Sequence, residues 1–110
     1  MRGTAIVLML ILHASVAAGE ESSIARQVYE ARCAFCHGVE GKGDGVAGQA
    51  LNPPPTNFTL ADFWKTTTSE TLRDAIANGK PGTAMVPFGK TLKPDQVDAL
   101  VEYLRSFAPQ

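Results

Sequence analysis

Near its beginning the chain carries one long run of apolar residues. Residues 5–12 are all apolar, a single basic residue, Arg2, precedes them, and small residues follow up to Ala18. This order is typical of a secretory signal peptide. A membrane anchor is the alternative, but crossing a bilayer takes about twenty apolar residues, and His13 interrupts this run. We therefore expect residues 1–18 to be cleaved off after Ala18.

Beyond residue 18, apolar positions recur at helical spacing. Ser22 and Ser23 are suitable caps for a first helix that runs to about Arg32, with an apolar stripe at Ile24, Val28 and Ala31. A brief helical turn is predicted over residues 60–65, capped by Thr59.

Two further helices are predicted in the second half of the chain. Thr67 and Glu70 match a capping box at the start of one, which Gly79 ends. Pro94 suits the first position of the other, whose apolar stripe continues to Phe107. No stretch alternates apolar and polar residues as a strand does. The pattern predicts an all-α domain over residues 19–110.

Long connections rich in glycine and proline separate these helices. Five glycines occur within residues 38–48, Pro53, Pro54 and Pro55 follow, and residues 80–90 hold two more of each type. Such segments form neither helices nor interior strands. The glycine-rich segment also resembles a phosphate-binding loop, but it lacks the required GK[ST] ending and a preceding strand. Short helices joined by long loops indicate a fold that wraps around something buried.

Composition and charge narrow the possible functions. The 110 residues include ten Lys plus Arg against eleven Asp plus Glu. This balance argues against a nucleic-acid binder, and a mature domain of this size usually needs a disulfide, a metal or a cofactor to complete its core. Without residues 1–18 the chain retains one histidine, His37, one methionine, Met85, and two cysteines.

The sequence Cys33-Ala34-Phe35-Cys36-His37 has the CxxCH spacing of haem c attachment. Its two thiols can add to the two vinyl groups of one haem, and the adjacent imidazole can reach the iron from the same side. The alternatives are a thioredoxin-like dithiol, which needs a preceding strand, and a zinc site, which needs a fourth ligand. A structural disulfide is a further alternative, although its loop would be strained.

Met85 lies in a loop between prolines and glycines, not on a helical face. A methionine is usually core filler. A thioether is, however, the expected sixth ligand opposite histidine in an electron-transfer haem. We therefore predict His37 and Met85 as iron ligands and Cys33 and Cys36 as the covalent attachment sites of one haem c.

These residues resemble the class I c-type cytochromes, particularly the small exported bacterial members. The resemblance covers the mature chain: a Tyr29-bearing helix before CxxCH, a glycine-rich loop, the Met85 loop and a closing helix. It implies a small all-α cytochrome c fold in which the first and last helices cross beside one haem, with Val28, Tyr29, Leu100, Leu104 and Phe107 at the crossing.

The resemblance also implies an exported electron carrier, most simply in the periplasm, that exchanges electrons with donor and acceptor redox proteins and is not itself an enzyme. Such a carrier has no permanent membrane span, although a membrane-bound oxidase or reductase is a possible partner. The alternatives are a haem subunit of a larger oxidoreductase complex, or a ligand-binding haem protein with Met85 off the iron.

Several details around the haem stay open at this stage. Where relatives have a proline whose carbonyl accepts from the proximal histidine, this chain has Gln49, so Gln49 or the segment 53–55 could supply that acceptor. Trp64 is either a propionate donor or a core aromatic, and Arg73 and Asn57 are weaker propionate candidates. We also predict that lysines form a basic rim around the haem edge, drawn from Lys42, Lys80, Lys90 and Lys93.

Overall fold

The computed structural model describes residues 2–3, 5–7 and 14–110, and these contain helices but no strand. Most of the predicted apolar run, and His13, lie outside the described residues. The helices are α1 (Ala14–Arg32), α2 (Ala34–His37), the 3-10 turn η1 (Gly48–Ala50), α3 (Ala61–Thr66), α4 (Ser69–Asn78) and α5 (Pro94–Arg105). The all-α prediction therefore agrees with the described part of the chain.

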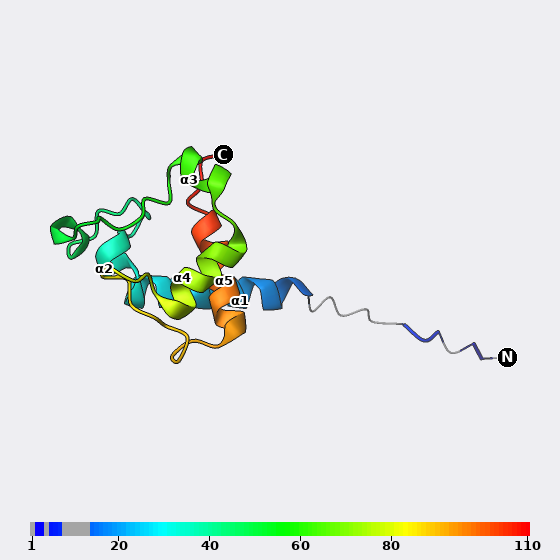
Figure 1. The fold of residues 1–110 in the computed structure, drawn as a ribbon. Helices are drawn as coiled ribbons and strands as arrows, with labels where there is room; N and C mark the ends of the chain where they lie inside the picture. Colours follow the sequence, from blue (N-terminus) through cyan, green and yellow to red (C-terminus); the bar gives the residue numbers. More distant parts are fainter. Residues whose placement is uncertain (1, 4, 8–13) are drawn as a thin grey trace.

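Two helices cross to form the centre of the core. In Figure 1, α5 passes over α1, and α4 packs against α5. At the crossing, the fully buried ring of Tyr29 contacts the rings of Tyr103 and Phe107, with centroids 5.2 and 5.3 Å away. Leu100 and Leu104 are buried in the same cluster. The predicted crossing of the first and last helices is present, and Phe107 packs there although it lies beyond the end of α5.

The start of the first helix and its buried stripe were predicted incorrectly. α1 begins at Ala14, so Ser22 and Ser23 are interior residues and not caps. Ile24 is 49% exposed, whereas Ala25 is 2% exposed and Tyr29 is fully buried. The buried stripe is shifted by one position from the predicted one. The cause is Tyr29, the largest side chain on this helix, because the helix face that carries it packs against α5.

Two predicted caps were also misplaced. The residue that caps α4 is Thr68, whose hydroxyl accepts from the Thr71 amide at 3.1 Å, and not Thr67. α3 starts after Leu60 with no side-chain cap, because Thr59 instead donates to Asn57 Oδ1 at 2.6 Å. Pro94 does begin α5, where the Lys93 amide donates to Gln96 Oε1 at 2.8 Å. Consecutive threonines give the sequence several equivalent caps, and only packing selects one.

Candidate functional site

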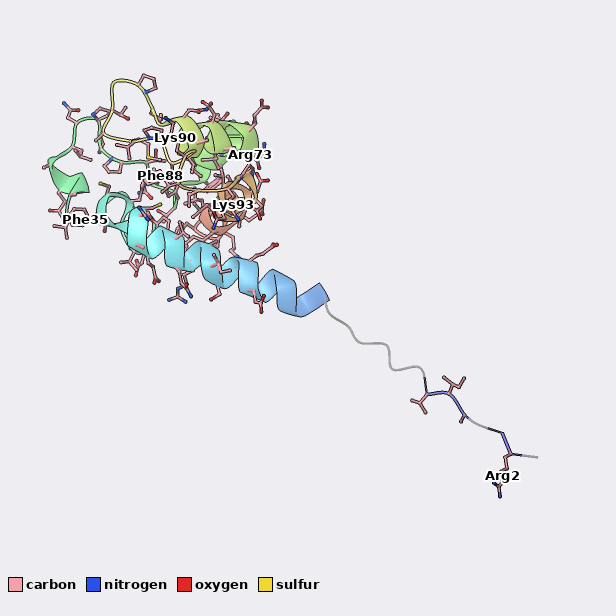
Figure 2. All side chains as sticks on the ribbon, turned by 90° about the horizontal axis from the view of Figure 1, so that it is seen from below. Arg2, Phe35, Arg73, Phe88, Lys90 and Lys93 are labelled. Atoms are coloured by element: carbon pink, nitrogen blue, oxygen red, sulfur yellow. The ribbon has the colours of Figure 1, made fainter. Side chains whose placement is uncertain are left out.

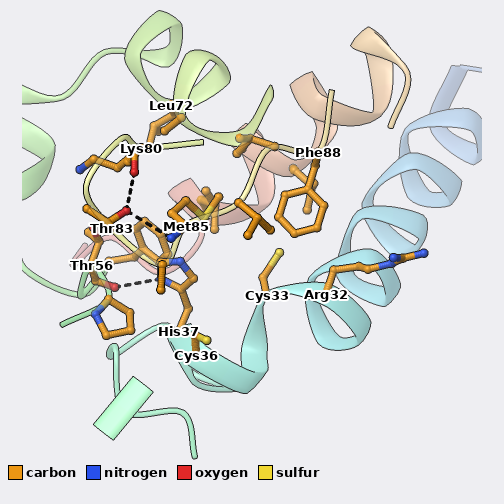
Figure 3. A pocket seen from close by; sticks show the side chains of 18 of the residues that line it. Arg32, Cys33, Cys36, His37, Thr56, Leu72, Lys80, Thr83, Met85 and Phe88 are labelled. Carbon is orange, nitrogen blue, oxygen red and sulfur yellow. Dashed lines mark hydrogen bonds between the residues drawn. The ribbon is translucent and has the colours of Figure 1, made fainter. Parts of the chain in front are cut away.

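The CxxCH motif forms a helical turn that continues from α1. The Cys33 amide donates to the Tyr29 carbonyl at 2.8 Å, and the His37 amide donates to the Cys33 carbonyl at 2.9 Å. In this backbone, Cys33, Cys36 and His37 stand at i, i+3 and i+4 and so lie on one helical face. All three line the same cavity, and Figure 3 shows Cys33 and His37 rising from this turn toward the segment that carries Met85.

The glycine-rich loop holds the carbonyl end of this turn. The amides of Gly43, Gly45 and Ala47 donate to the carbonyls of His37, Cys36 and Phe35, at 2.7, 3.0 and 2.9 Å in that order. A Cβ on Gly45 would come within 2.6 Å of the Ala34 carbonyl, which explains why a residue without a side chain stands there. The loop therefore satisfies backbone acceptors that the end of a short helix leaves open.

His37 is oriented by two contacts. Its Nδ1 lies 3.2 Å from the Thr56 carbonyl oxygen, and its ring stacks on Phe58 with centroids 4.9 Å apart. The acceptor is therefore neither Gln49 nor the segment 53–55; the rigid prolines instead deliver the next residue, Thr56. Burial lowers the pKa of His37, so the imidazole is neutral near pH 7, and donation from Nδ1 to Thr56 leaves Nε2 available as a ligand.

Met85 lies on the other side of the cavity, in a loop closed by its own hydrogen bonds. The Lys80 amide donates to the Met85 carbonyl at 3.1 Å. The Thr83 hydroxyl donates to the Lys80 carbonyl at 2.8 Å and accepts from the Met85 amide at 3.2 Å, as the dashed lines in Figure 3 show. A second anchor joins this loop to α4, where the Phe88 amide donates to the Ile76 carbonyl at 2.9 Å.

Between these two walls is a cavity of about 390 Å³ with a largely apolar lining. Besides the four predicted site residues, the lining includes Leu72, Ile76, Phe88, Leu92, Leu100 and Leu104. Two thiols on one wall suit covalent attachment to the vinyl groups of haem, and an imidazole on that wall and a thioether in the opposite loop are suitable ligands for its iron. The residues present therefore fit haem c, and the apolar lining fits its flat hydrocarbon ring.

The structure does not support the competing interpretations of the motif. Burial raises the pKa of the Cys33 thiol to about 11, whereas a thioredoxin-like dithiol needs a lowered one and a neighbouring sheet. Among the described residues there is no group of three or more His, Cys, Asp or Glu that could hold a metal ion.

The three propionate candidates, Trp64, Arg73 and Asn57, are engaged elsewhere. Trp64 donates from Nε1 to the Phe58 carbonyl at 2.7 Å and packs in the core, so the structure favours the core-aromatic interpretation. Arg73 pairs with Asp98 at 2.7 Å, and Asn57 accepts from Thr59. None of these candidates lines the cavity.

One residue near the cavity mouth was missed by the sequence analysis. Arg32 lines the cavity together with Lys80, and Figure 3 shows its side chain beside Cys33. The sequence did contain a signal for this residue, because Arg32 directly precedes the CxxCH motif. Lys42, by contrast, pairs with Glu40 at 2.9 Å and does not line the cavity, which sets it apart from Lys80.

Comparison with known proteins identifies the family. The sequence profile described as "Cytochrome C oxidase, cbb3-type, subunit III" matches residues 21–104. The chain belongs to this family. It is a c-type cytochrome domain whose function is electron transfer, and its family implies haem c as the cofactor. These findings confirm the resemblance predicted from the CxxCH motif and the Met85 loop.

A curated relative and several solved structures support this assignment. The "Cbb3-type cytochrome c oxidase subunit CcoP" of Azospirillum sp. (strain B510) is 36% identical over 86 residues, which are 74% of this chain and 29% of that protein. The "KustC0563 c-type cytochrome" has a TM-score of 0.65 and 31% identity, covering 77% of this chain and 98% of that one.

A larger assembly contains a similar domain. The "Kuenenia stuttgartiensis reducing HAO-like protein complex Kustc0457/Kustc0458" includes a chain with a TM-score of 0.67 and 32% identity, covering 76% of this cytochrome and 41% of that chain. This cytochrome therefore spans less than half of that chain and less than a third of the Azospirillum relative. No helix among the described residues is long and apolar enough to cross a membrane.

Proposed function

We propose that residues 19–110 carry one haem c, held by thioether bonds to Cys33 and Cys36 and ligated by His37 and Met85. The observation that carries this proposal is the convergence of these four side chains on one apolar cavity. When bound, haem c supplies one-electron exchange between ferrous and ferric iron.

The surrounding residues perform supporting tasks. Thr56 and Phe58 hold the imidazole of His37, and Thr83 holds the backbone of Met85. Leucine and phenylalanine side chains exclude water, which together with methionine ligation favours a raised potential. Because His37 and Met85 would occupy both axial positions, the site is suited to electron transfer and not to binding a substrate.

We also propose that the domain is exported to the periplasm after cleavage at Ala18. It would act either as a mobile carrier or as the haem subunit of a larger oxidoreductase. An oxidase or reductase complex as partner is supported by two relatives, one described as a subunit of a cytochrome c oxidase and the other as part of a reducing HAO-like protein complex.

A basic rim at the cavity mouth favours an acidic partner. Among the described residues 19–110, Arg32, Lys80, Lys90 and Lys93 are the cations outside ion pairs. Arg32 and Lys80 line the cavity, Lys90 and Lys93 flank its lining residue Leu92, and Figure 2 shows Lys90 beside Phe88.

The direct test is an optical redox titration of the exported protein, combined with its intact mass. We expect a mass lower by residues 1–18 and higher by one haem, a single one-electron wave, and no carbon monoxide binding by the reduced protein. Ready binding of carbon monoxide would instead indicate the ligand-binding alternative with Met85 off the iron. A full-length chain without bound haem would contradict the proposal.

A further inference from the structure

A second, shallow hollow lies outside the haem cavity, along α2 and the glycine-rich loop. Three large apolar side chains line it and stay exposed: Phe35 (67%), Val39 (70%) and Val46 (77%). The two hollows share no lining residue. Single exposed apolar residues are ordinary, but several gathered in one depression mark an interaction surface.

The backbone of the loop produces this arrangement. Val39 and Val46 stand near its two ends, and the amide of Gly45 donates to the Cys36 carbonyl at 3.0 Å, which folds the loop back over α2. Phe35 lies between Cys33 and Cys36, so anything seated in the hollow is next to the residues proposed to hold haem c.

The charges that line this hollow are all negative: Glu30, Glu40 and Asp44. Arg26 and Lys42 pair with the first two at 2.9 Å from outside the lining, and Asp44 has no ion pair among the described residues. We name the three apolar and three acidic residues together the acidic hollow. Its partner must therefore present an apolar surface flanked by lysine or arginine.

A surface of that kind exists on the same molecule. Two members of the basic rim, Arg32 and Lys80, line the cavity together with Met85 and Val86, and Val86 is 56% exposed. Figure 2 shows Phe35 well away from Lys90 and Lys93, so one copy cannot bring its own two surfaces together. Two copies can.

We propose that a second copy of this cytochrome docks its basic rim on the acidic hollow, head to tail, and exchanges an electron there. This inference rests on the proposed haem site. One copy loses one electron as the other gains it, so no proton or further reactant is needed. The contact is weak and transient because its charges are exposed and two of the carboxylates already have intramolecular partners.

Electron self-exchange provides the test, since it needs no other protein. Mixtures of oxidised and reduced holoprotein are followed by NMR exchange broadening, with sedimentation over the same concentrations. We expect Lys80→Glu and Glu40→Lys each to slow self-exchange about threefold or more, and Lys42→Gln, which frees Glu40, to accelerate it. The self-exchange rate of the wild type should fall when the ionic strength rises from about 0.02 to 0.5 M.

Mixing the two charge-reversed variants distinguishes this geometry from others. Lys80→Glu retains an intact hollow and Glu40→Lys retains an intact rim, so exchange between them should be faster than either self-exchange. The double variant Val39→Ser and Val46→Ser should also be slow. Matched controls on exposed residues outside both surfaces, Leu60→Ser and Glu70→Lys, should leave the rate unchanged.

Three results would overturn the proposal. The first is a self-exchange rate that Glu40→Lys leaves unchanged, and the second is a cross-exchange rate between the two variants no higher than their self-exchange rates. The third is a self-exchange rate that Lys80→Glu raises, which would indicate contact between two rims. The haem spectrum and reduction by a small-molecule reductant are measured for every variant. Loss of those signals is a failure of the proposed haem site, whereas intact signals with unchanged self-exchange reject only the head-to-tail contact.

Discussion

Tyr29 connects the packing of the helices to the proposed haem attachment turn. Its ring is fully buried at the crossing of α1 and α5, and its hydroxyl donates to the Gly38 carbonyl at 2.6 Å, one residue after His37. The phenol thus satisfies a buried acceptor at the end of the turn. Removing one hydroxyl should therefore affect both stability and the environment of His37.

We expect Tyr29→Phe to reduce the free energy of unfolding by about 1–2 kcal/mol, because the Gly38 carbonyl loses its partner. Burial raises the pKa of Tyr29 above its ordinary value of 10.0. The folded state therefore favours the neutral phenol. This contribution to the free energy of unfolding is fully present below pH 10.0 and is lost as pH rises above that value. Denaturation as a function of pH should show a smaller alkaline loss in the variant, with some loss remaining because the pKa of Tyr103 is also raised.

Met85 allows a direct test of the proposed axial ligation. Met85→Ala should open the sixth position, lower the reduction potential and permit stoichiometric carbon monoxide binding, because the predicted mature chain has no other methionine. Optical titration measures all three effects. Val86→Ala, one residue away and 56% exposed in the wild type, is the matched control. An unchanged spectrum in Met85→Ala would assign the sixth position to another group.

At the scale of elements, the loops determine where the donors lie. The glycine-rich loop caps the CxxCH turn, and the loop of Met85 is joined to α4 by the hydrogen bond from Phe88 to Ile76. Both depend on close backbone approach: a Cβ on Gly79 would come within 2.7 Å of the Met85 carbonyl. The glycines are therefore part of the site although they contribute no side chain.

Gly45→Ala should destabilise the domain by about 1–3 kcal/mol, because the added methyl group meets the carbonyls of Ala34 and Phe35. Thermal denaturation of the holoprotein gives the stability, and the haem spectrum shows whether the turn has shifted. Gly19→Ala is the control, since a Cβ there meets nothing within 4 Å. Equal stability of both variants would show that the loop backbone shifts to accommodate the methyl group with no loss in the free energy of unfolding.

On the scale of the whole molecule, the cavity lies inside the core instead of beside it. Leu72, Ile76, Leu100 and Leu104 belong both to the buried cluster and to the cavity lining. A bound apolar group therefore completes the core and stabilises the native state by mass action. Arg32 and Lys80 of the proposed basic rim line the same cavity.

Replacing Cys33 and Cys36 with alanine should yield a chain that releases haem into acidified solvent and unfolds with little cooperativity. The wild type should retain haem under the same extraction, because two covalent bonds hold it. Circular dichroism on heating compares the two chains. A compact, cooperatively folded variant without haem would contradict a cofactor-dependent core.

Charge reversal at Lys80 and Lys90 should slow association with an acidic redox partner and leave the reduction potential nearly unchanged. Exposed charges act mainly on the association rate, and salt screens them over about 8 Å at physiological ionic strength. Stopped-flow electron transfer across a salt series measures this, with Lys65→Glu, which lies in an ion pair on α3, as control. A rate that does not fall with salt would exclude steering by the rim.

The sequence by itself determined the chemistry, because local spacing is sufficient for it. Cys33, Cys36 and His37 share a helical face wherever that turn forms, and Met85 is the only methionine beyond the predicted signal. The absence of strand periodicity likewise indicated an all-α fold. Cleavage after Ala18 and the assigned roles of these four residues stay predictions.

Only the tertiary structure decided which residues surround that chemistry. Thr56 accepts a hydrogen bond from His37, and Thr68 caps α4. Arg32 lines the cavity with Lys80, and Lys42 forms an ion pair with Glu40. The cap of α4 is a choice among neighbouring threonines, the acceptor for His37 is a choice among backbone carbonyls, and the rim is a choice among scattered basic residues, and local propensity separates none of these. The path of the loops in space separates them, because a carbonyl or a charge acts on whatever lies within a few ångströms, regardless of its distance along the chain.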